Sequence, residues 1–189
     1  MQSSEPSRRF FTPTRVWDAL ALLVIAFAIW KIFIAPLSFN PPGSQPAPHA
    51  VYQRLDGGTF RIVDQRGRMV FLDFYASWCE PCKIELPMVA AWSKAHPDAI
   101  VVPIDVGESR NTATAFAFQY RLKNVALDPQ YSARPLFGVE GFPTVVVIDQ
   151  SGSVRARWQG LNPAIALAMS NALRLRSGQA PRLRSEQAP

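Results

Sequence analysis

The only two cysteines of the chain, Cys79 and Cys82, lie where a buried strand gives way to a helix. Residues 69–75 are apolar, β-branched and aromatic, which predicts the strand. The residues after Cys82 predict the helix, because apolar side chains recur at helical spacing with Lys83, Glu85 and Lys94 between them: Ile84, Met88, Val89 and Trp92. Unpaired N–H groups and the dipole at a helix start favour a thiolate at Cys79. The arrangement therefore predicts a redox-active pair.

The stretch from Phe71 to Lys83 resembles the active-site strand and turn of thioredoxins. Glu85-Leu86-Pro87 and the later residues 141–144 are similar to the membrane-anchored TlpA and ResA group. The resemblance covers roughly residues 51–173. It implies an α/β fold, a thioredoxin-like sandwich with a mixed central sheet, and thiol–disulfide exchange as the reaction.

The 189 residues allow one domain with appendages. We expect residues 1–15 to form a cytoplasmic N-terminus, 16–35 a transmembrane anchor, 36–50 a Pro-rich linker, 51–175 the thioredoxin-like domain and 176–189 a basic disordered tail. Residues 174–181 and 182–189 form a tandem octapeptide repeat, and two copies are too few for a solenoid. The net charge of +6 comes mostly from the two ends, so the domain offers little reason to expect nucleic acid.

Residues 16–35 are almost wholly apolar and long enough to span a bilayer as a helix. Arg8, Arg9 and Arg15 precede them, whereas residues 36–53 contain no Lys or Arg. The positive-inside rule then predicts a single pass through a bacterial inner membrane, with the N-terminus cytoplasmic and the domain periplasmic.

Two other interpretations of this segment remain open. The apolar run 19–30 has the length of a cleaved signal peptide, and residues 7–11 hint at a twin-arginine signal. Against cleavage, no A-x-A site follows and Pro36 occupies the expected position. A buried helix of a soluble protein would need a polar face, which the segment lacks.

Within the domain, strands and helices alternate and a hairpin and a last helix follow, an order that indicates an α/β sandwich around a mixed sheet. The predicted elements are a short strand near 57–64, a buried strand at 99–105 with Pro103 near an end or an irregularity, a helix at 112–122, a turn at 127–129, a short helix at 130–137, strands at 144–148 and 154–158, and a helix capped by Asn162 with Pro163 first, running to about Leu175.

Cys79 is expected to attack a substrate disulfide, and Cys82, one turn further along, to resolve the mixed disulfide. Pro81 limits the freedom of the turn between them. Soft-metal binding, copper(I) in particular, is an alternative use of the two thiolates. No second C-x-x-C completes a zinc site, so we expect no metal site and no cofactor other than the redox-active disulfide. A purely structural disulfide would remove little chain entropy.

Three acidic residues accompany the cysteines. Glu80 opposes thiolate formation at Cys79, which favours a reductant, although acids also favour helix starts for structural reasons. By resemblance to ResA-like proteins, Glu85 tunes cysteine acidity or contacts substrate. Asp73 lies inside an apolar strand and matches the buried aspartate of thioredoxins, where it would accept the Cys82 proton; ResA-like proteins are expected to have a neutral residue there. The alternative is a solvated aspartate at a strand end.

The loop at residues 141–144 is expected to face the cysteines. By resemblance, the Phe142–Pro143 bond is cis, and the backbone of Phe142, next to Thr144, pairs with an extended substrate. Trp78 is expected to cover the active site, with a core aromatic as the alternative. His96 is expected to cap its helix rather than bind a metal.

Together these features predict a membrane-tethered thiol–disulfide oxidoreductase that reduces disulfides of exported proteins. The TlpA and ResA resemblance implies apocytochromes c or copper-site assembly proteins as substrates and a membrane thiol-electron transporter as reductant. A disulfide oxidase or isomerase, or a copper(I) metallochaperone, are the alternatives.

Overall fold

A computed structural model of the protein describes residues 13–29 and 45–175, which belong to two separate units. The first unit contains helix α1, Pro13–Ile29. Its apolar side chains are exposed, as at Leu22, Leu23 and Val24. Among the described residues, no helix reaches the length and apolarity needed to cross a bilayer. Residues 30–35 of the predicted anchor lie outside the described part, as do most of the predicted linker and the whole tail.

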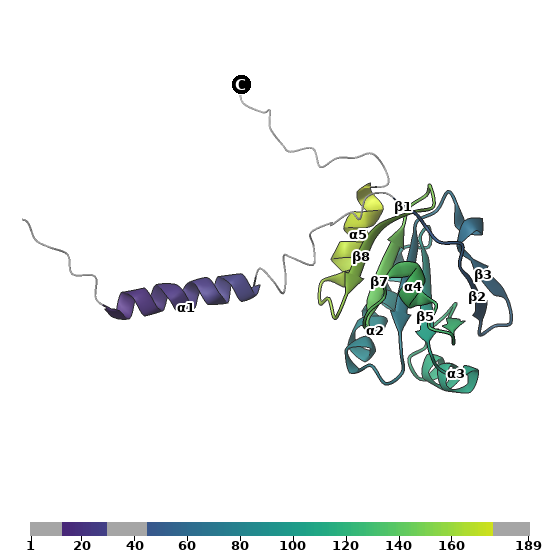
Figure 1. Ribbon diagram of the computed structural model, residues 1–189, viewed down its shortest axis with the longest axis horizontal. Helices are drawn as coiled ribbons and strands as arrows, with labels where there is room; N and C mark the ends of the chain where they lie inside the picture. The colour runs from purple at the N-terminus through teal and green to yellow at the C-terminus, as the bar shows by residue number, and fades with distance from the viewer. Residues whose placement is uncertain (1–12, 30–44, 176–189) are drawn as a thin grey trace, which may run out of the picture. The chain divides into compact units, whose positions relative to one another are not determined.

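The second unit is built on an eight-stranded sheet in the order β1-β8-β7-β4-β5-β6-β2-β3 (Figure 1). β4 and β5, and β5 and β6, run parallel, whereas the other neighbours are antiparallel. The predicted mixed sheet is therefore confirmed. The strands are β1 Gln45–Pro46, β2 Val51–Arg54, β3 Thr59–Arg61, β4 Val70–Tyr75, β5 Ile100–Val106, β6 Ala126–Asp128, β7 Thr144–Ile148 and β8 Ser153–Gln159.

Helices cover both faces of this sheet. They are α2 Glu80–Ala95, α3 Arg110–Gln119, α4 Ala133–Phe137 and α5 Ile165–Leu175, with a 3₁₀ helix, η3, at Ile62–Gln65. α2 and α5 pack together on one face, where Trp92 Nε1 donates to Ser170 Oγ at 2.8 Å. Phe137 of α4 packs on the opposite face against Leu72 and Phe74. The two covered faces make the sandwich that the sequence predicts.

Strand β4 is buried along its whole length. Its alternate side chains reach two different cores, since successive residues of a strand point to opposite faces. Leu72 and Phe74 join the core under α4, whereas Phe71 joins the core under α2 and α5. Tyr75 joins a third cluster together with Cys79 and Cys82. The chain therefore passes from β4, at the centre of the sheet, directly into the turn that carries the cysteines.

The structure corrects four local predictions. Residues 45–50 are not all linker, because β1 pairs with β8 and Ala50 is buried in the core. Residues 127–129 do not form a plain turn, because β6 ends only at Asp128. Pro103 lies inside β5; it is tolerated there because β6 pairs only with residues 104–106, so no neighbour on that side needs the missing N–H. The last helix begins at Ile165, although Asn162 Oδ1 still accepts from the Ala164 N–H.

Helix α2 buries a different stripe from the one predicted. Its buried residues are Cys82, Glu85, Leu86, Val89 and Trp92. Ile84 was expected on the core face but is 59% exposed. Glu85 was expected between the apolar positions but is 1% exposed. His96 caps the helix as predicted, with its ring Nδ1 2.9 Å from the Trp92 carbonyl oxygen.

Candidate active site

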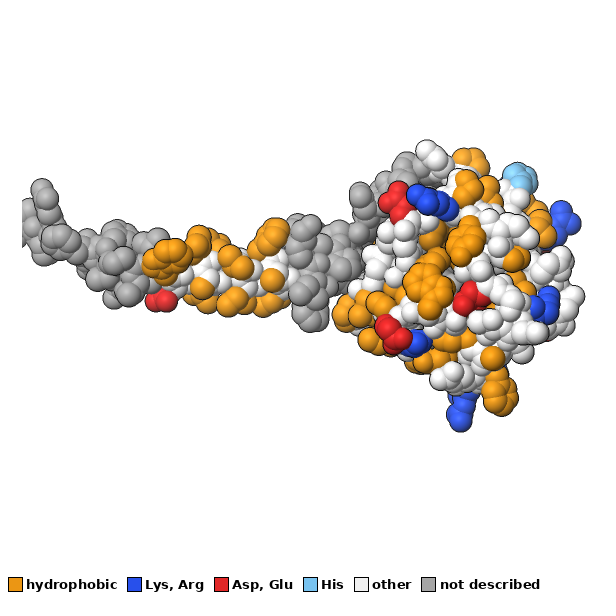
Figure 2. All heavy atoms as spheres, turned by 60° about the horizontal axis from the view of Figure 1, so that its bottom comes forward, with side chains coloured by type: hydrophobic (Ala, Val, Ile, Leu, Met, Phe, Trp, Pro, Cys, Tyr) orange, Lys and Arg blue, Asp and Glu red, His pale blue; other side chains and the backbone are white. Residues whose placement is uncertain are grey.

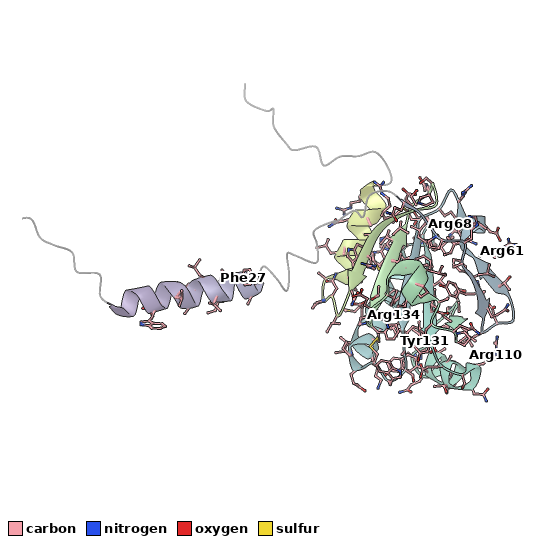
Figure 3. All side chains as sticks on the ribbon, in the orientation of Figure 1. Phe27, Arg61, Arg68, Arg110, Tyr131 and Arg134 are labelled. Carbon is pink, nitrogen blue, oxygen red and sulfur yellow. A yellow bond between two sulfur atoms is a disulfide. The ribbon has the colours of Figure 1, made fainter. Side chains whose placement is uncertain are left out.

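The two cysteines form a disulfide at the start of α2 (Figure 3). β4 ends at Tyr75, and a turn follows in which the Cys79 N–H donates to the Ala76 carbonyl at 3.1 Å. Cys79 is the N-cap residue of α2, and the Cys82 N–H lies 3.2 Å from its Sγ. Pro81 occupies the first turn of the helix, where its missing N–H costs nothing. The sulfur of Cys79 therefore lies at the positive end of the helix dipole.

Of the two sulfur-bearing residues, Cys79 alone is accessible to solvent. Cys82 is 0% exposed and Cys79 is 4% exposed. Both pack with Leu86, Phe116 and Val125 in an apolar cluster. Cys79 is thus the more accessible of the two sulfurs, and the lower exposure predicted for Cys82 is confirmed.

Trp78 and the loop at 141–144 form the surface beside Cys79. Trp78 is 66% exposed, which rules out the alternative of a core aromatic. Its ring meets the Phe142 ring edge to face with centroids 5.9 Å apart. The Phe142–Pro143 bond is cis, as the resemblance implies. Thr144 is buried, and its hydroxyl donates to the Gly141 carbonyl at 2.7 Å, which ties the loop to the start of β7.

Asp73 in β4 and Glu85 in α2 are buried acidic residues of the two elements that flank the cysteines. Asp73 is 0% exposed, so it is not a solvated residue at a strand end. Neither of its oxygens has a hydrogen-bond partner among the described residues. Burial, and then the neighbouring Glu85 carboxyl, raise the pKa of Asp73 well above its ordinary value. Burial therefore favours the neutral form of the Asp73 carboxyl over its charged form.

Glu85 has one specific partner. Its Oε2 accepts a hydrogen bond from the Asn162 N–H at 2.7 Å. Burial raises the pKa of Glu85 to about 7, and that hydrogen bond partly opposes the rise. Glu85 is buried, so it does not contact substrate directly in this state.

Glu80 lies apart from the other acids. Its side chain is exposed and forms an ion pair with Lys83. The Lys83 ammonium offsets the negative charge of Glu80, so the effect of Glu80 on Cys79 is weaker than a lone carboxylate would give. The structural role at the helix start explains its position as well.

Sequence reasoning missed a second acidic group at the end of β5. Asp105 is 1% exposed, and its register partner in β4 is Tyr75. Glu108 follows, and its two carboxylate oxygens accept the Ser77 N–H and hydroxyl, each at 2.6 Å. Asp105 closes a run of apolar residues, which is the same signal that singled out Asp73. The sequence around Glu108 does not single it out, because its hydrogen-bond partner Ser77 lies 31 positions away in the chain.

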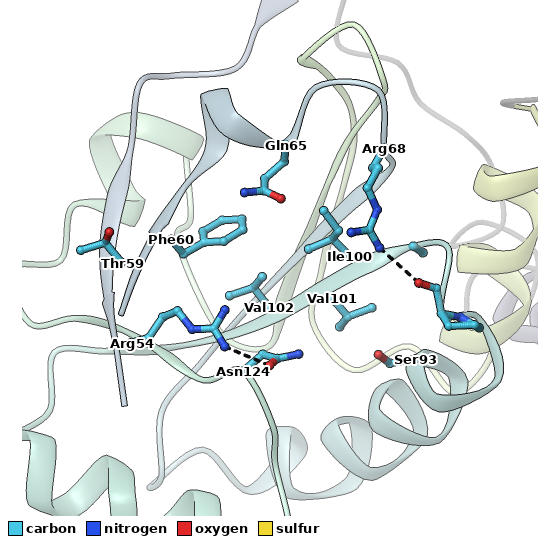
Figure 4. Close-up of a pocket in the computed structure, with 12 residues that line it drawn as sticks. Arg54, Thr59, Phe60, Gln65, Arg68, Ser93, Ile100, Val101, Val102 and Asn124 are labelled. Atoms are coloured by element: carbon cyan, nitrogen blue, oxygen red, sulfur yellow. Dashed lines mark hydrogen bonds between the residues drawn. The ribbon is translucent and has the colours of Figure 1, made fainter. Parts of the chain in front are cut away.

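The surface at this end of the domain is partly apolar. Figure 2, which brings the lower end of Figure 1 forward, shows apolar side chains gathered on one face with isolated acidic and basic groups among them. A pocket of about 410 Å³ lies elsewhere, against β5 and the end of α2 (Figure 4). The two arginines that line it already form hydrogen bonds within the protein: Arg54 donates to the Asn124 side chain, and Arg68 donates to the Pro97 carbonyl. No cysteine lines this pocket, so it is not the site of thiol chemistry.

Comparisons with known proteins agree with this geometry. Residues 44–157 match the AhpC/TSA family. The chain is 30% identical to the thiol-disulfide oxidoreductase ResA of Geobacillus thermodenitrificans over 142 residues, which is 72% of this chain and 79% of that protein. It is 30% identical to ResA of Bacillus subtilis, covering 78% of this chain and 83% of that one.

A solved structure is similar as well. A putative thiol:disulfide interchange protein DsbE from Chlorobium tepidum superposes with a TM-score of 0.63 at 30% identity. The match covers 74% of this chain and 99% of that chain.

Proposed function

The chain belongs to the AhpC/TSA family and to the ResA-like thiol–disulfide oxidoreductases, and from that premise we propose that it reduces disulfides of exported proteins. It is a thiol–disulfide oxidoreductase. The observation that carries the proposal is the Cys79–Cys82 disulfide at the start of α2, with Cys79 facing the surface formed by Trp78 and Phe142.

The reaction needs only the two cysteines and a proton acceptor. In the reduced protein, the Cys79 thiolate attacks one sulfur of a substrate disulfide and releases the other as a thiolate. Cys82 then loses its proton and attacks the Cys79 sulfur, which releases the second substrate thiolate. The protein is left as the disulfide, and two electrons have passed to the substrate. Asp73, which is buried and unpaired, is the proposed acceptor for the Cys82 proton.

The surroundings of the disulfide favour a reductant. Among the described residues, no hydrogen bond or ion pair links either sulfur to a cationic side chain. Asp73 in β4 and Glu85 in α2 are buried carboxyls of the elements that flank the cysteines, and their charged forms disfavour a nearby thiolate. A strong oxidant requires a strongly stabilised thiolate, whereas the stabilising feature identified here is the dipole of α2 at Cys79.

We propose that the domain works in the periplasm, held at the inner membrane by residues 16–35 with the N-terminus in the cytoplasm. The exposed apolar side chains of α1 support an apolar environment for this segment. A membrane thiol-electron transporter would reduce the disulfide again after each turnover. Apocytochromes c and copper-site assembly proteins are the proposed substrates, and the electrons are carried by the cysteine pair itself without a bound cofactor.

Trapping of mixed disulfides tests the attacking role of Cys79 and the resolving role of Cys82. Cys82→Ser removes the resolving thiol, so it should accumulate mixed disulfides between Cys79 and its substrates in cells. Cys79→Ser should form none. Mass spectrometry of the trapped complexes identifies the substrates. Equal trapping by the two variants would contradict the assigned roles, and trapping of cytoplasmic proteins alone would contradict the proposed location.

A further inference from the structure

The turn that leads from β4 to Cys79 is held by a residue outside both flanking elements. The Cys79 N–H closes residues 76–79 onto the Ala76 carbonyl at 3.1 Å, and the two central residues of this turn are Ser77 and Trp78. The N–H groups of central residues take no part in the bond that closes a turn. The Ser77 N–H donates instead to one carboxylate oxygen of Glu108, and the Ser77 hydroxyl donates to the other, each at 2.6 Å. Glu108 therefore holds Ser77 at two points.

The chain just before Glu108 is fixed. Gly107 has a φ of 79°, in the left-handed region that favours glycine, and its N–H donates to the Asp128 carbonyl at 2.9 Å. A Cβ at this position would overlap the ring of Tyr131, so the ring packs directly on the glycine. This contact and the hydrogen bond fix where Glu108 leaves β5.

The chain just after Glu108 is fixed as well. Ser109 caps the N-terminus of α3. Arg110 reaches across to the neighbouring hairpin, where its guanidinium donates to the carbonyls of Arg54 and Leu55, each at 3.2 Å (Figure 3). Glu108 is thus a side chain on a rigid support, which is what a residue that positions another segment requires.

The residue whose placement depends on Ser77 is Trp78. Cys79 has anchors of its own, because it is the N-cap of α2 and is bonded to Cys82. The Trp78 side chain is 66% exposed, and its ring meets Phe142 edge to face. An exposed ring contact does little to order a side chain, whereas hydrogen bonds to a carboxylate are among the stronger ones in proteins. The backbone that Glu108 holds therefore sets the direction in which the indole leaves the turn.

We propose that Glu108 is a positioning residue that, by holding both donors of Ser77, directs the Trp78 indole against Phe142 and so shapes the surface that a protein substrate meets beside Cys79. Glu108 acts through Ser77 and has no hydrogen bond to either sulfur. Its effect comes from geometry rather than from its charge. The inference rests on the proposed reduction of protein disulfides, but the placement of the indole is measured without any reaction.

Nuclear magnetic resonance of the full-length, isotope-labelled, oxidised chain tests the placement. Glu108→Leu keeps a side chain of similar length but offers no acceptor. The nuclear Overhauser effects between the Trp78 and Phe142 rings should therefore weaken strongly, and the Ser77 amide should exchange its hydrogen faster. Glu108→Gln is the conservative rescue, because its amide oxygen accepts from the Ser77 N–H and its NH₂ group donates to the Ser77 hydroxyl oxygen. Both measurements should stay as in the wild type, and a Gln variant as impaired as the Leu variant would overturn the proposal.

Kinetics separate positioning from general damage. Reduced full-length variants are mixed with insulin as a protein disulfide and with oxidised glutathione as a small one. Glu108→Leu should slow the reaction with insulin roughly two- to tenfold, the loss expected for one aromatic contact, and leave the rate with glutathione near the wild-type value. In a Trp78→Ala background, Glu108→Leu should cause no further loss, because both changes act through the same indole. Additive losses would contradict the proposal.

Two further variants complete the design. Ser77→Ala removes the hydroxyl and keeps the N–H, so it should weaken the ring contact and the insulin rate less than Glu108→Leu does. Asp64→Leu is the control, because Asp64 is an exposed acid paired with Arg61, and it should change neither measurement. Wild-type ring contacts in Ser77→Ala or in Glu108→Leu would overturn the proposal. A wild-type protein that does not reduce insulin would instead contradict the proposed function and leave the placement of the indole standing.

Discussion

The Glu85 carboxylate accepts a 2.7 Å hydrogen bond from the backbone N–H of Asn162, a residue 77 positions away. Glu85 lies in the first half of α2, close after Cys82, and Asn162 lies at the entry to α5. The bond therefore joins the helix that carries the cysteines to the last helix of the domain. It also explains how a carboxyl group is accommodated in the buried stripe of α2.

Replacement of Glu85 by Leu should destabilise the fold more than replacement by Gln. Gln keeps an oxygen that can accept from Asn162, whereas Leu leaves a buried N–H unpaired at a cost of about 1–3 kcal/mol. Urea unfolding of the oxidised protein measures the difference. Glu140→Gln, at an exposed position, is the control and should change little. Equal unfolding midpoints for the Leu and Gln variants would contradict this account.

The stability of the oxidised protein should fall as pH rises from about 5 to about 8. Burial raises the pKa of Glu85 to about 7 and of Asp105 to about 8, whereas the same groups in the unfolded chain titrate near about 4. The folded protein thus binds more protons in this range, and their stabilising effect is lost as pH passes the folded values. Denaturant unfolding at several pH values measures the slope. A stability that rises with pH over this range would be evidence against the assigned protonation states.

Asp73→Val should stabilise the fold and slow the reaction. The substitution removes a buried, unpaired carboxyl, so the free energy of unfolding at pH 8 should increase by about 1–3 kcal/mol. Loss of the proton acceptor should slow the release of reduced substrate by roughly 10²-fold. Asp73→Asn should show the same kinetic defect, because an amide cannot accept the Cys82 proton. Stopped-flow kinetics of the step in which Cys82 attacks the mixed disulfide measures this defect. Wild-type rates in both variants would exclude Asp73 as the acceptor of the Cys82 proton.

Trp78→Ala should affect substrates according to their size. The indole of Trp78 is mostly exposed and packs edge to face on Phe142, so it contributes little to stability. An aromatic contact of this kind between the exposed indole and a protein substrate would contribute about 0.5–1.5 kcal/mol, so its loss should raise KM for a protein disulfide roughly two- to tenfold. The rate with a small disulfide should stay near the wild-type value. Equal losses for both substrates would indicate damage to the cysteine pair itself.

The sequence predicted the fold and the reacting sulfurs because those signals are local. An apolar strand, two cysteines and an amphipathic helix follow one another within residues 69–95, and Asp73 stood out because no polar residue surrounds it in its strand. The failures concern contacts between distant segments. Glu85 is buried in place of Ile84 because its carboxylate accepts from the Asn162 N–H. The hydrogen bonds from Ser77 to Glu108 form because β5 ends beside β4. β6 was missed because a three-residue strand is stabilised by its neighbours rather than by its own pattern.

The reduction potential of the Cys79–Cys82 pair tests the central claim most directly. Equilibration of the full-length protein with glutathione or dithiothreitol buffers at pH 7, followed by thiol alkylation, gives the value. The buried carboxyls of Asp73 and Glu85 disfavour a thiolate, and within residues 13–29 and 45–175 no cationic side chain bonds to either sulfur; together these features predict a potential close to that of thioredoxin, about −270 mV. A value near that of the strong oxidants, about −120 mV, would contradict the assignment as a reductant.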